Sequence, residues 1–198
     1  DADISRVNAW STLGFFKDPV FSEMLKKHKG ELAELIFHEL FHGTIYAKSS
    51  VDMNENLANF IGRKASLLMM QSDTSALHEY EIDLAEEQDY DRFILRSAKK
   101  LDSLYSELEQ KNAPVNIRKA EKEKIIYGVC MELDKRLHLN SAKAFRLKNR
   151  FVTSGNAYFM HFKRYDAMSD SLEKVLQNKY KGNLRDMIIG LKSEIKSL

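Results

Sequence analysis

The chain has 198 residues, 43% of them hydrophobic and 30% charged, which is enough to bury the core of one compact domain. The formal net charge of +2, with both signs interspersed, gives no electrostatic case for a nucleic-acid partner. No apolar run approaches the roughly 20 residues of a membrane-spanning helix, and the single cysteine, Cys130, excludes an intrachain disulfide.

The predicted elements are helices, beginning with two short ones. Asp18 and Pro19 form an N-cap and N1 pair that opens a helix ending at about His28. Gly30 separates this helix from a second one, over residues 31–43, which ends at a glycine.

The next segment has the composition of a strand. Residues 44–47 precede two serines, so we expect a short strand or an extended loop there. Asn54 is then the predicted N-cap of a third helix, which places Glu55 in its first turn. The apolar positions of this helix follow helical spacing and comprise Leu57, Phe60, Ile61, Ala65 and Leu68.

The rest of the chain also has helical periodicity. A long helix is predicted over residues 75–110, with a break at Pro114. Further helices are expected at about 116–138, 141–153, 156–178 and 183–196. The fold class is therefore mainly α, with at most a small β element near the N-terminus and after the second helix.

We expect one domain over residues 1–198, because no repeat or flexible linker divides the sequence. The chain begins at Asp1 without a methionine, so we expect a processed protein or the C-terminal part of a longer one. An export signal or envelope anchor would then lie upstream; without one, the protein would be cytoplasmic.

The second helix carries His38-Glu39-Leu40-Phe41-His42, an H-E-x-x-H pattern. Four residues are slightly more than one helical turn, so both imidazoles project from the same face. Glu39 lies beside them, where a carboxylate acts on a bound water rather than on the metal. Glu55, thirteen residues after His42, can supply a third ligand. Two histidines, one carboxylate and an open position make the usual catalytic zinc sphere.

The alternative interpretation is a pair of surface histidines on a helix. Residues 32–42 are apolar nearly all round, which indicates a buried helix. Burying two imidazoles and a carboxylate there without partners would cost several kcal/mol, and a bound metal removes that cost.

Longer stretches around these residues resemble a family of predicted bacterial zinc aminopeptidases. The family's zinc-helix pattern, L-I-F-H-E-L-x-H, is similar to residues 35–42, and its F-N-E-x-x-A-x-F-V pattern to residues 53–61. Residues 9–19 resemble its A-Y-S-T-L-G-x-F-x-D-P stretch, and Asn156-Ala157 with Tyr165 its late N-A…T-Y pattern. The resemblance runs from about Val7 to about Leu184 and is loose in the final third.

Some positions differ from the family pattern. Phe41 stands where an alanine is usual, Gly43-Thr44 where a glutamine is common, and Arg164 where a threonine precedes the late tyrosine. None of these changes removes a ligand, but they leave the substrate preference open. The spacing from His42 to Glu55 is also shorter than in other gluzincins, so their substrate subsites do not transfer.

The resemblance implies a helical zincin-like metallopeptidase domain that binds one Zn²⁺ per chain through His38, His42 and Glu55. Glu39 would be the general base of a metal-activated water that hydrolyses peptide bonds, removing N-terminal residues from a peptide substrate. Two alternatives stay open: a zinc endopeptidase of the same chemistry, and a non-catalytic helical interaction domain with a vestigial metal site. A large sheet beside the zinc helix is missing, and residues 7–16 or upstream sequence would have to supply it.

Four further residues are candidates for the site. Tyr165, which matches the family, and His161 are candidates for the donor to the developing oxyanion, against the alternative of core residues. Asn156 matches the family but can also cap its helix, and Asn59 either orients a zinc histidine or is exposed.

Two stretches of the sequence are candidates for substrate contacts. Thr12 and Gly14 belong to a stretch that either binds peptide backbone by strand addition or forms a structural turn. An exopeptidase must anchor the α-amino group of its substrate, generally with carboxylates, and Glu31 and Glu34 lie near in sequence.

Overall fold

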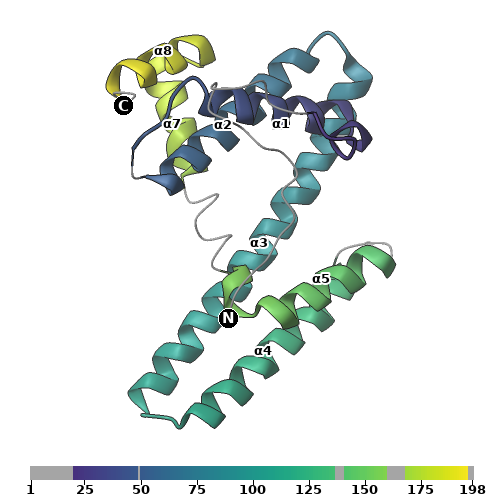
Figure 1. The fold of residues 1–198 in the computed structure, drawn as a ribbon, viewed down its shortest axis with the longest axis vertical. Helices are drawn as coiled ribbons and strands as arrows, with labels where there is room; N and C mark the ends of the chain where they lie inside the picture. The colour runs from purple at the N-terminus through teal and green to yellow at the C-terminus, as the bar shows by residue number, and fades with distance from the viewer. Residues whose placement is uncertain (1–19, 49, 137–140, 160–167, 196–198) are drawn as a thin grey trace. The chain divides into compact units, whose positions relative to one another are not determined.

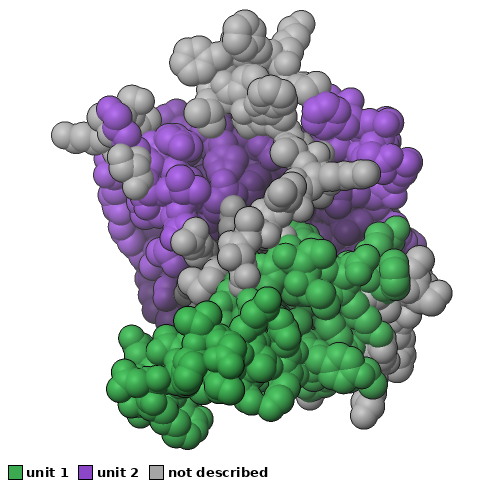
Figure 2. All heavy atoms as spheres, turned by 60° about the horizontal axis from the view of Figure 1, so that its bottom comes forward, with its two compact units in different colours: residues 1–5, 87–163 green, residues 6–86, 164–198 purple. Residues whose placement is uncertain are grey.

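The structure is a computed structural model, and it describes residues 20–48, 50–136, 141–159 and 168–195. These residues are almost all helical and include no strand, so the prediction of a mainly α fold is confirmed. The chain divides into two compact units, coloured separately in Figure 2. Unit 1 comprises residues 1–5 and 87–163, and unit 2 comprises residues 6–86 and 164–198. That the whole chain acts as one catalytic domain stays a prediction.

Unit 2 holds two neighbouring helices that pack closely along their length, α1 and α2 (Figure 1). The elements of this unit are the 3₁₀ helix η1 (Met24–Lys26), α1 (Lys29–His42), α2 (Val51–Met70), the start of α3 (Thr74–Gln110), α7 (Ser169–Tyr180) and α8 (Leu184–Glu194).

Helix α1 begins and ends where local chemistry allows it. The N-cap is His28, whose backbone amide donates to the Glu31 carboxylate in a capping box. Gly43 is the C-cap, and its amide donates to the Glu39 carbonyl. The predicted bounds, 31–43, are therefore within two residues of those observed.

Two predicted helices have other bounds than expected, and the segment 44–47 took one of its two predicted forms. Of the helix expected up to His28, only the short η1 forms among the described residues. No strand forms at 44–47, so the extended-loop alternative holds there. The predicted 156–178 helix does not run through to its end as one piece, because α7 begins at Ser169 after Met168 as N-cap.

The start of α2 also differs from the prediction. Its N-cap is Ser50 rather than Asn54, so Glu55 lies in the second turn of the helix and not in the first. The Asn54 side chain is buried and binds backbone groups elsewhere, which leaves it unable to cap the helix.

The core of unit 2 lies between α2 and the C-terminal helices. Phe41 at the end of α1 and Ile45 in the following loop also pack into it. The other buried members of this cluster are Leu57, Ala58, Phe60, Ile61, Leu172, Leu176, Leu184 and Met187. Burial of these side chains fixes the face of α2 that turns toward the core, and hence the face that turns toward α1.

Unit 1 is built from the rest of α3 with α4 (Val115–Arg136) and α5 (Ser141–Ser154). Between α3 and α4 the chain turns at Asn112, whose φ of 47° is left-handed, just before Pro114. The predicted bounds of these helices agree with the structure to within two residues. The buried cluster of this unit comprises Phe93, Ile94, Ala98, Leu101, Ile126, Val129, Cys130, Leu133, Phe151, Tyr158 and Phe159.

Within the described ranges, no helix combines the length and the apolar character needed to cross a bilayer.

Candidate metal centre

Helices α1 and α2 bring the three predicted metal ligands together. The Nε2 atoms of His38 and His42 lie 3.0 Å apart. Glu55 on α2 places one carboxylate oxygen 3.4 Å from Nε2 of His38 and the other 3.5 Å from Nε2 of His42. The three side chains therefore bring potential ligand atoms together between the helices, within 4.8 Å of one another, with a different Glu55 oxygen near each histidine.

These distances can be compared with those of a zinc site. Zinc–ligand bonds of about 2.0–2.1 Å in a tetrahedron place neighbouring ligand atoms about 3.3–3.4 Å apart. The three separations, between 3.0 and 3.5 Å, lie close to that value. Two imidazoles and a carboxylate are also ligands that zinc prefers, so the donor set fits the ion.

Burial and charge give the two imidazoles different proton affinities. Burial disfavours the charged form of His38, but the hydrogen bond and charge of Glu55, helped by Glu39 and Asn59, outweigh it and raise the His38 pKa. For His42, burial and the neighbouring His38 lower the pKa, and Glu55 offsets only part of that effect. His42 is therefore the histidine that more readily presents a neutral nitrogen.

The polar neighbours of the two imidazoles differ as well. Asn59 is one turn after Glu55 on α2, and its side chain hydrogen-bonds His38. One of the two predicted roles of Asn59 is to orient a zinc histidine. That role requires such a contact, because a hydrogen bond of this kind fixes the orientation of a ligating imidazole. The buried Nδ1 of His42 has no hydrogen-bond partner among the described residues.

Glu39 is next to His38 on α1 and is half-buried. Successive helical residues are separated by about 100° around the axis. Glu39 therefore projects to one side of the helix face that carries the two histidines. Its negative charge is close enough to raise the pKa of His38. The carboxylate is therefore a close charged neighbour of the candidate metal centre.

Asn54 has a role that the sequence did not reveal. Its Oδ1 accepts the Ala47 amide at 2.7 Å, and its Nδ2 donates to the Ala47 carbonyl at 2.8 Å. This pair of bonds holds the loop after α1 against the start of α2, one residue before Glu55. The sequence shows an asparagine next to the apolar positions of this helix, but it does not show that Ala47 is the partner of that asparagine.

The two carboxylates considered for the substrate amine are already engaged. Glu31 accepts the backbone amide of His28 in the capping box. Glu34 accepts a hydrogen bond from the Tyr80 hydroxyl and has Arg63 Nε 3.5 Å from its carboxylate. These contacts give Glu34 a structural role in joining α1, α2 and α3.

Of the remaining candidates, only Asn156 is described. It lies in unit 1, where it accepts a hydrogen bond from the Tyr105 hydroxyl at 3.0 Å and donates one to the same oxygen at 2.7 Å. The other four, Thr12, Gly14, His161 and Tyr165, lie outside the described residues. Their roles stay predictions.

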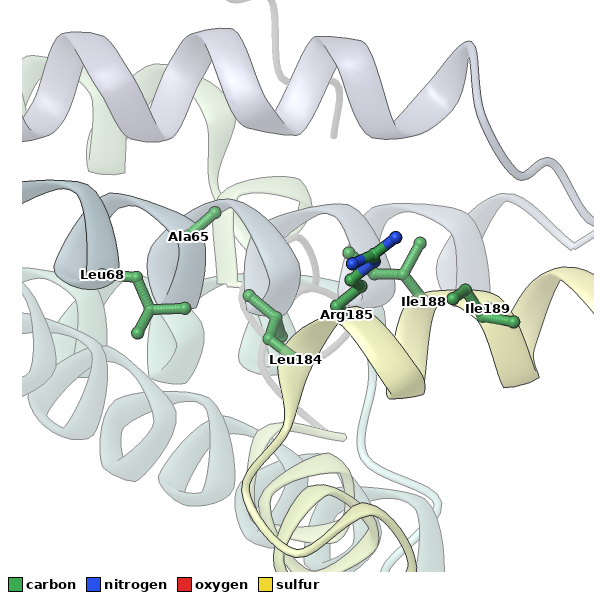
Figure 3. A pocket seen from close by; sticks show the side chains of 6 residues that line it. All are labelled: Ala65, Leu68, Leu184, Arg185, Ile188 and Ile189. Atoms are coloured by element: carbon green, nitrogen blue, oxygen red, sulfur yellow. The ribbon is translucent and has the colours of Figure 1, made fainter.

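An apolar pocket of about 490 Å³ opens between α2 and α8 (Figure 3). Ala65, on its wall, is ten residues after Glu55 on α2, which is about 15 Å along the helix axis. The pocket is thus distinct from the metal centre. Its lining residues are Ala65, Leu68, Leu184, Arg185, Ile188 and Ile189.

A family model described as "Putative aminopeptidase" matches residues 1–192, nearly the whole chain. The chain belongs to this family. The matched range contains all of unit 1, unit 2 up to residue 192, and all three residues of the candidate metal centre. The family resemblance found in the sequence is therefore confirmed at the level of an aminopeptidase family.

Membership of the aminopeptidase family supports a peptidase activity. A search of curated proteins and a search of solved structures found no match to the chain.

Proposed function

We propose that this aminopeptidase-family chain is a zinc-dependent peptidase that removes N-terminal residues from peptides. The observation that carries the proposal is the convergence of His38, His42 and Glu55 at separations between 3.0 and 3.5 Å. Structural zinc sites normally have four protein ligands, often with cysteine, whereas this set offers three without cysteine. That difference favours a catalytic site over a structural one.

Each residue of the site has a distinct task in this proposal. His38, His42 and Glu55 would hold one Zn²⁺, which when bound supplies a polarised water and a Lewis acid for the scissile carbonyl. Asn59 keeps the His38 ring oriented through its hydrogen bond. Glu39 takes the water proton on a carboxylate oxygen and delivers it to the departing amine.

The first test is metal content and peptide hydrolysis on purified protein. The wild type should hold about one zinc per chain and hydrolyse a fluorogenic peptide with a free N-terminus. Glu39→Gln should keep the zinc and lose activity by about 10²–10⁴-fold, the usual range for a general base. Glu81→Gln, an exposed carboxylate on α3, is the matched control and should behave as wild type.

The outcomes separate the competing functions. Cleavage of an N-acetylated peptide as readily as of the free one would replace the aminopeptidase proposal with an endopeptidase. A wild type that binds zinc but has the same negligible activity as Glu39→Gln would indicate a non-catalytic domain. A wild type that cannot be loaded with zinc would contradict the proposal altogether.

A further inference from the structure

The interface between α1 and α2 is antiparallel and carries one polar contact per helical turn. Glu55 and Asn59 lie opposite the two histidines, and the same register continues beyond the metal centre. From one end to the other, the opposed residues are His42 with Glu55, His38 with Asn59, Glu34 with Arg63, and Gly30 with Ser66.

Gly62 on α2 lies directly against the backbone of α1 in this register. A β-carbon at this buried glycine would lie 2.9 Å from the Glu34 carbonyl oxygen, 3.2 Å from the His38 amide nitrogen and 3.5 Å from the His38 Cα. All three neighbours are backbone atoms of α1. They cannot rotate away, so a side chain here would have to move the helix itself.

The N-terminal end of α1 has little room to follow such a movement. The Tyr80 ring packs against Gly30, where an added β-carbon would clash with the ring. The Tyr80 hydroxyl donates to Glu34, and Ser66 Oγ donates to the Gly30 carbonyl at 2.7 Å. With this end anchored, a side chain at position 62 would displace mainly the His38 end of α1.

We propose that Gly62 is a positioning residue of the metal centre. Its lack of a side chain lets the α1 backbone approach α2, and this approach sets the separation between the His38 imidazole and the Glu55 carboxylate. The inference rests on the function proposed above. Widening the contact from 2.9 Å to an ordinary 3.4 Å would move α1 by about half an ångström. Metal–ligand distances tolerate only about 0.2 Å, so the site would lose part of its affinity.

The test compares Gly62→Ala with Gly128→Ala. Gly128 is an exposed glycine on α4, where an added β-carbon meets no atom within 4 Å. Both changes raise helix propensity equally, so their difference isolates the contact with α1. Gly62→Ala should bind zinc about 10–100-fold more weakly, the range seen when residues supporting a metal site are changed. Gly128→Ala should bind zinc as the wild type does.

Zinc affinity is measured by competition with a chromophoric chelator, and the visible spectrum of Co²⁺-loaded protein is recorded alongside. The Co²⁺ spectrum depends on coordination geometry, so Gly62→Ala should change its shape as well as its intensity. A general loss of stability would not change the spectrum of the loaded protein. An unchanged affinity and spectrum would overturn the inference.

Ser66→Ala distinguishes positioning from simple weakening of the interface. It removes the hydrogen bond to Gly30 without pushing α1 away, so stability should fall while zinc affinity stays within about twofold of wild type. A loss of affinity equal to that of Gly62→Ala would overturn the inference.

If Gly62→Ala does not fold in buffer, the comparison is made in trimethylamine N-oxide, which favours compact states. Failure to fold there would also overturn the inference, because Gly62 would then serve the whole fold. A wild type without zinc would instead overturn the proposed function itself.

Discussion

The side chain of Asn54 binds the backbone of Ala47 twice, through its Oδ1 and its Nδ2, as a neighbouring β-strand would. Both bonds are buried. They close the loop between α1 and α2 at the position directly before Glu55.

Replacing Asn54 with alanine should therefore destabilise unit 2. The amide of Ala47 would be left buried without its partner, at about 1–3 kcal/mol, and its carbonyl would keep only the 3.4 Å bond from the Ser50 amide, at a further cost of about 1 kcal/mol. We expect a loss of about 2–4 kcal/mol in the free energy of unfolding, measured by urea titration. Asn178→Ala, at an exposed position on α7, is the control and should change it by less than about 0.5 kcal/mol. Equal losses in the two variants would contradict the role of the Asn54 bonds.

Zinc should stabilise the fold by binding the folded state. At a free zinc concentration of 100 times Kd, one site adds about 2.7 kcal/mol to the free energy of unfolding. We expect the melting temperature of the wild type to rise with zinc and to fall when EDTA is added. His42→Ala should show no rise, and His78→Ala, at an exposed histidine, should respond as wild type. Equal stabilisation of His42→Ala would place the zinc elsewhere.

The pH dependence of unit 2 should include a contribution from His28. A hydrogen bond from its Nδ1 to Asp83, at 2.9 Å, and the charge of Asp83 raise the pKa of His28. Because the folded-state pKa is the higher one, this stabilisation is fully present below the unfolded value of about 6.5. It is lost as pH rises through the folded value.

The His28 pKa can be followed by NMR titration of its imidazole. Asp83→Asn removes the charge, so the pKa should fall toward its usual value, and the pH-dependent stabilisation should shrink with it. His78→Gln is the control and should leave the His28 titration unchanged. An Asp83→Asn variant with the wild-type His28 pKa would show that another group is responsible.

Tyr80 should contribute to stability through its hydroxyl. The buried ring packs on Gly30, and the hydroxyl donates to Glu34. Burial and the Glu34 charge both raise the pKa of Tyr80, so the hydroxyl keeps its proton at neutral pH. Tyr80→Phe should lower the free energy of unfolding by about 1–3 kcal/mol. Tyr127→Phe, at a tyrosine that is 68% exposed, should change it little, and a similar loss there would contradict the assignment.

Much of the helical framework could be predicted because the apolar spacing of each helix is a local property. The bounds of α1 were predicted to within two residues from Gly30, near its start, and Gly43, at its end. The start of α2 could not be predicted, because asparagine is favoured equally as an N-cap and as a partner for loop backbone. Which of these roles Asn54 takes depends on Ala47, which becomes its neighbour only when the loop folds back.

The candidate metal centre likewise has residues that the sequence predicts and contacts that it does not. The candidate ligands, a histidine pair and Glu55, could be found from sequence, because the spacing of the histidines on one helix face and the residues around all three are themselves the signal. The contacts of Gly62 and Glu34 could not be found, because they depend on which residues of α1 lie opposite α2. An antiparallel register between two helices is a tertiary property that neither helix encodes alone.

Cys130 gives unit 1 a built-in chemical probe. It is the only cysteine in the sequence, and its side chain is buried in the cluster around Leu133 and Phe151. A thiol reagent can therefore react only when that cluster opens, and the labelling rate measures the opening directly in the unmutated protein. Run in parallel with zinc binding, which reports on unit 2, thiol labelling would show whether the two units lose structure together or one at a time.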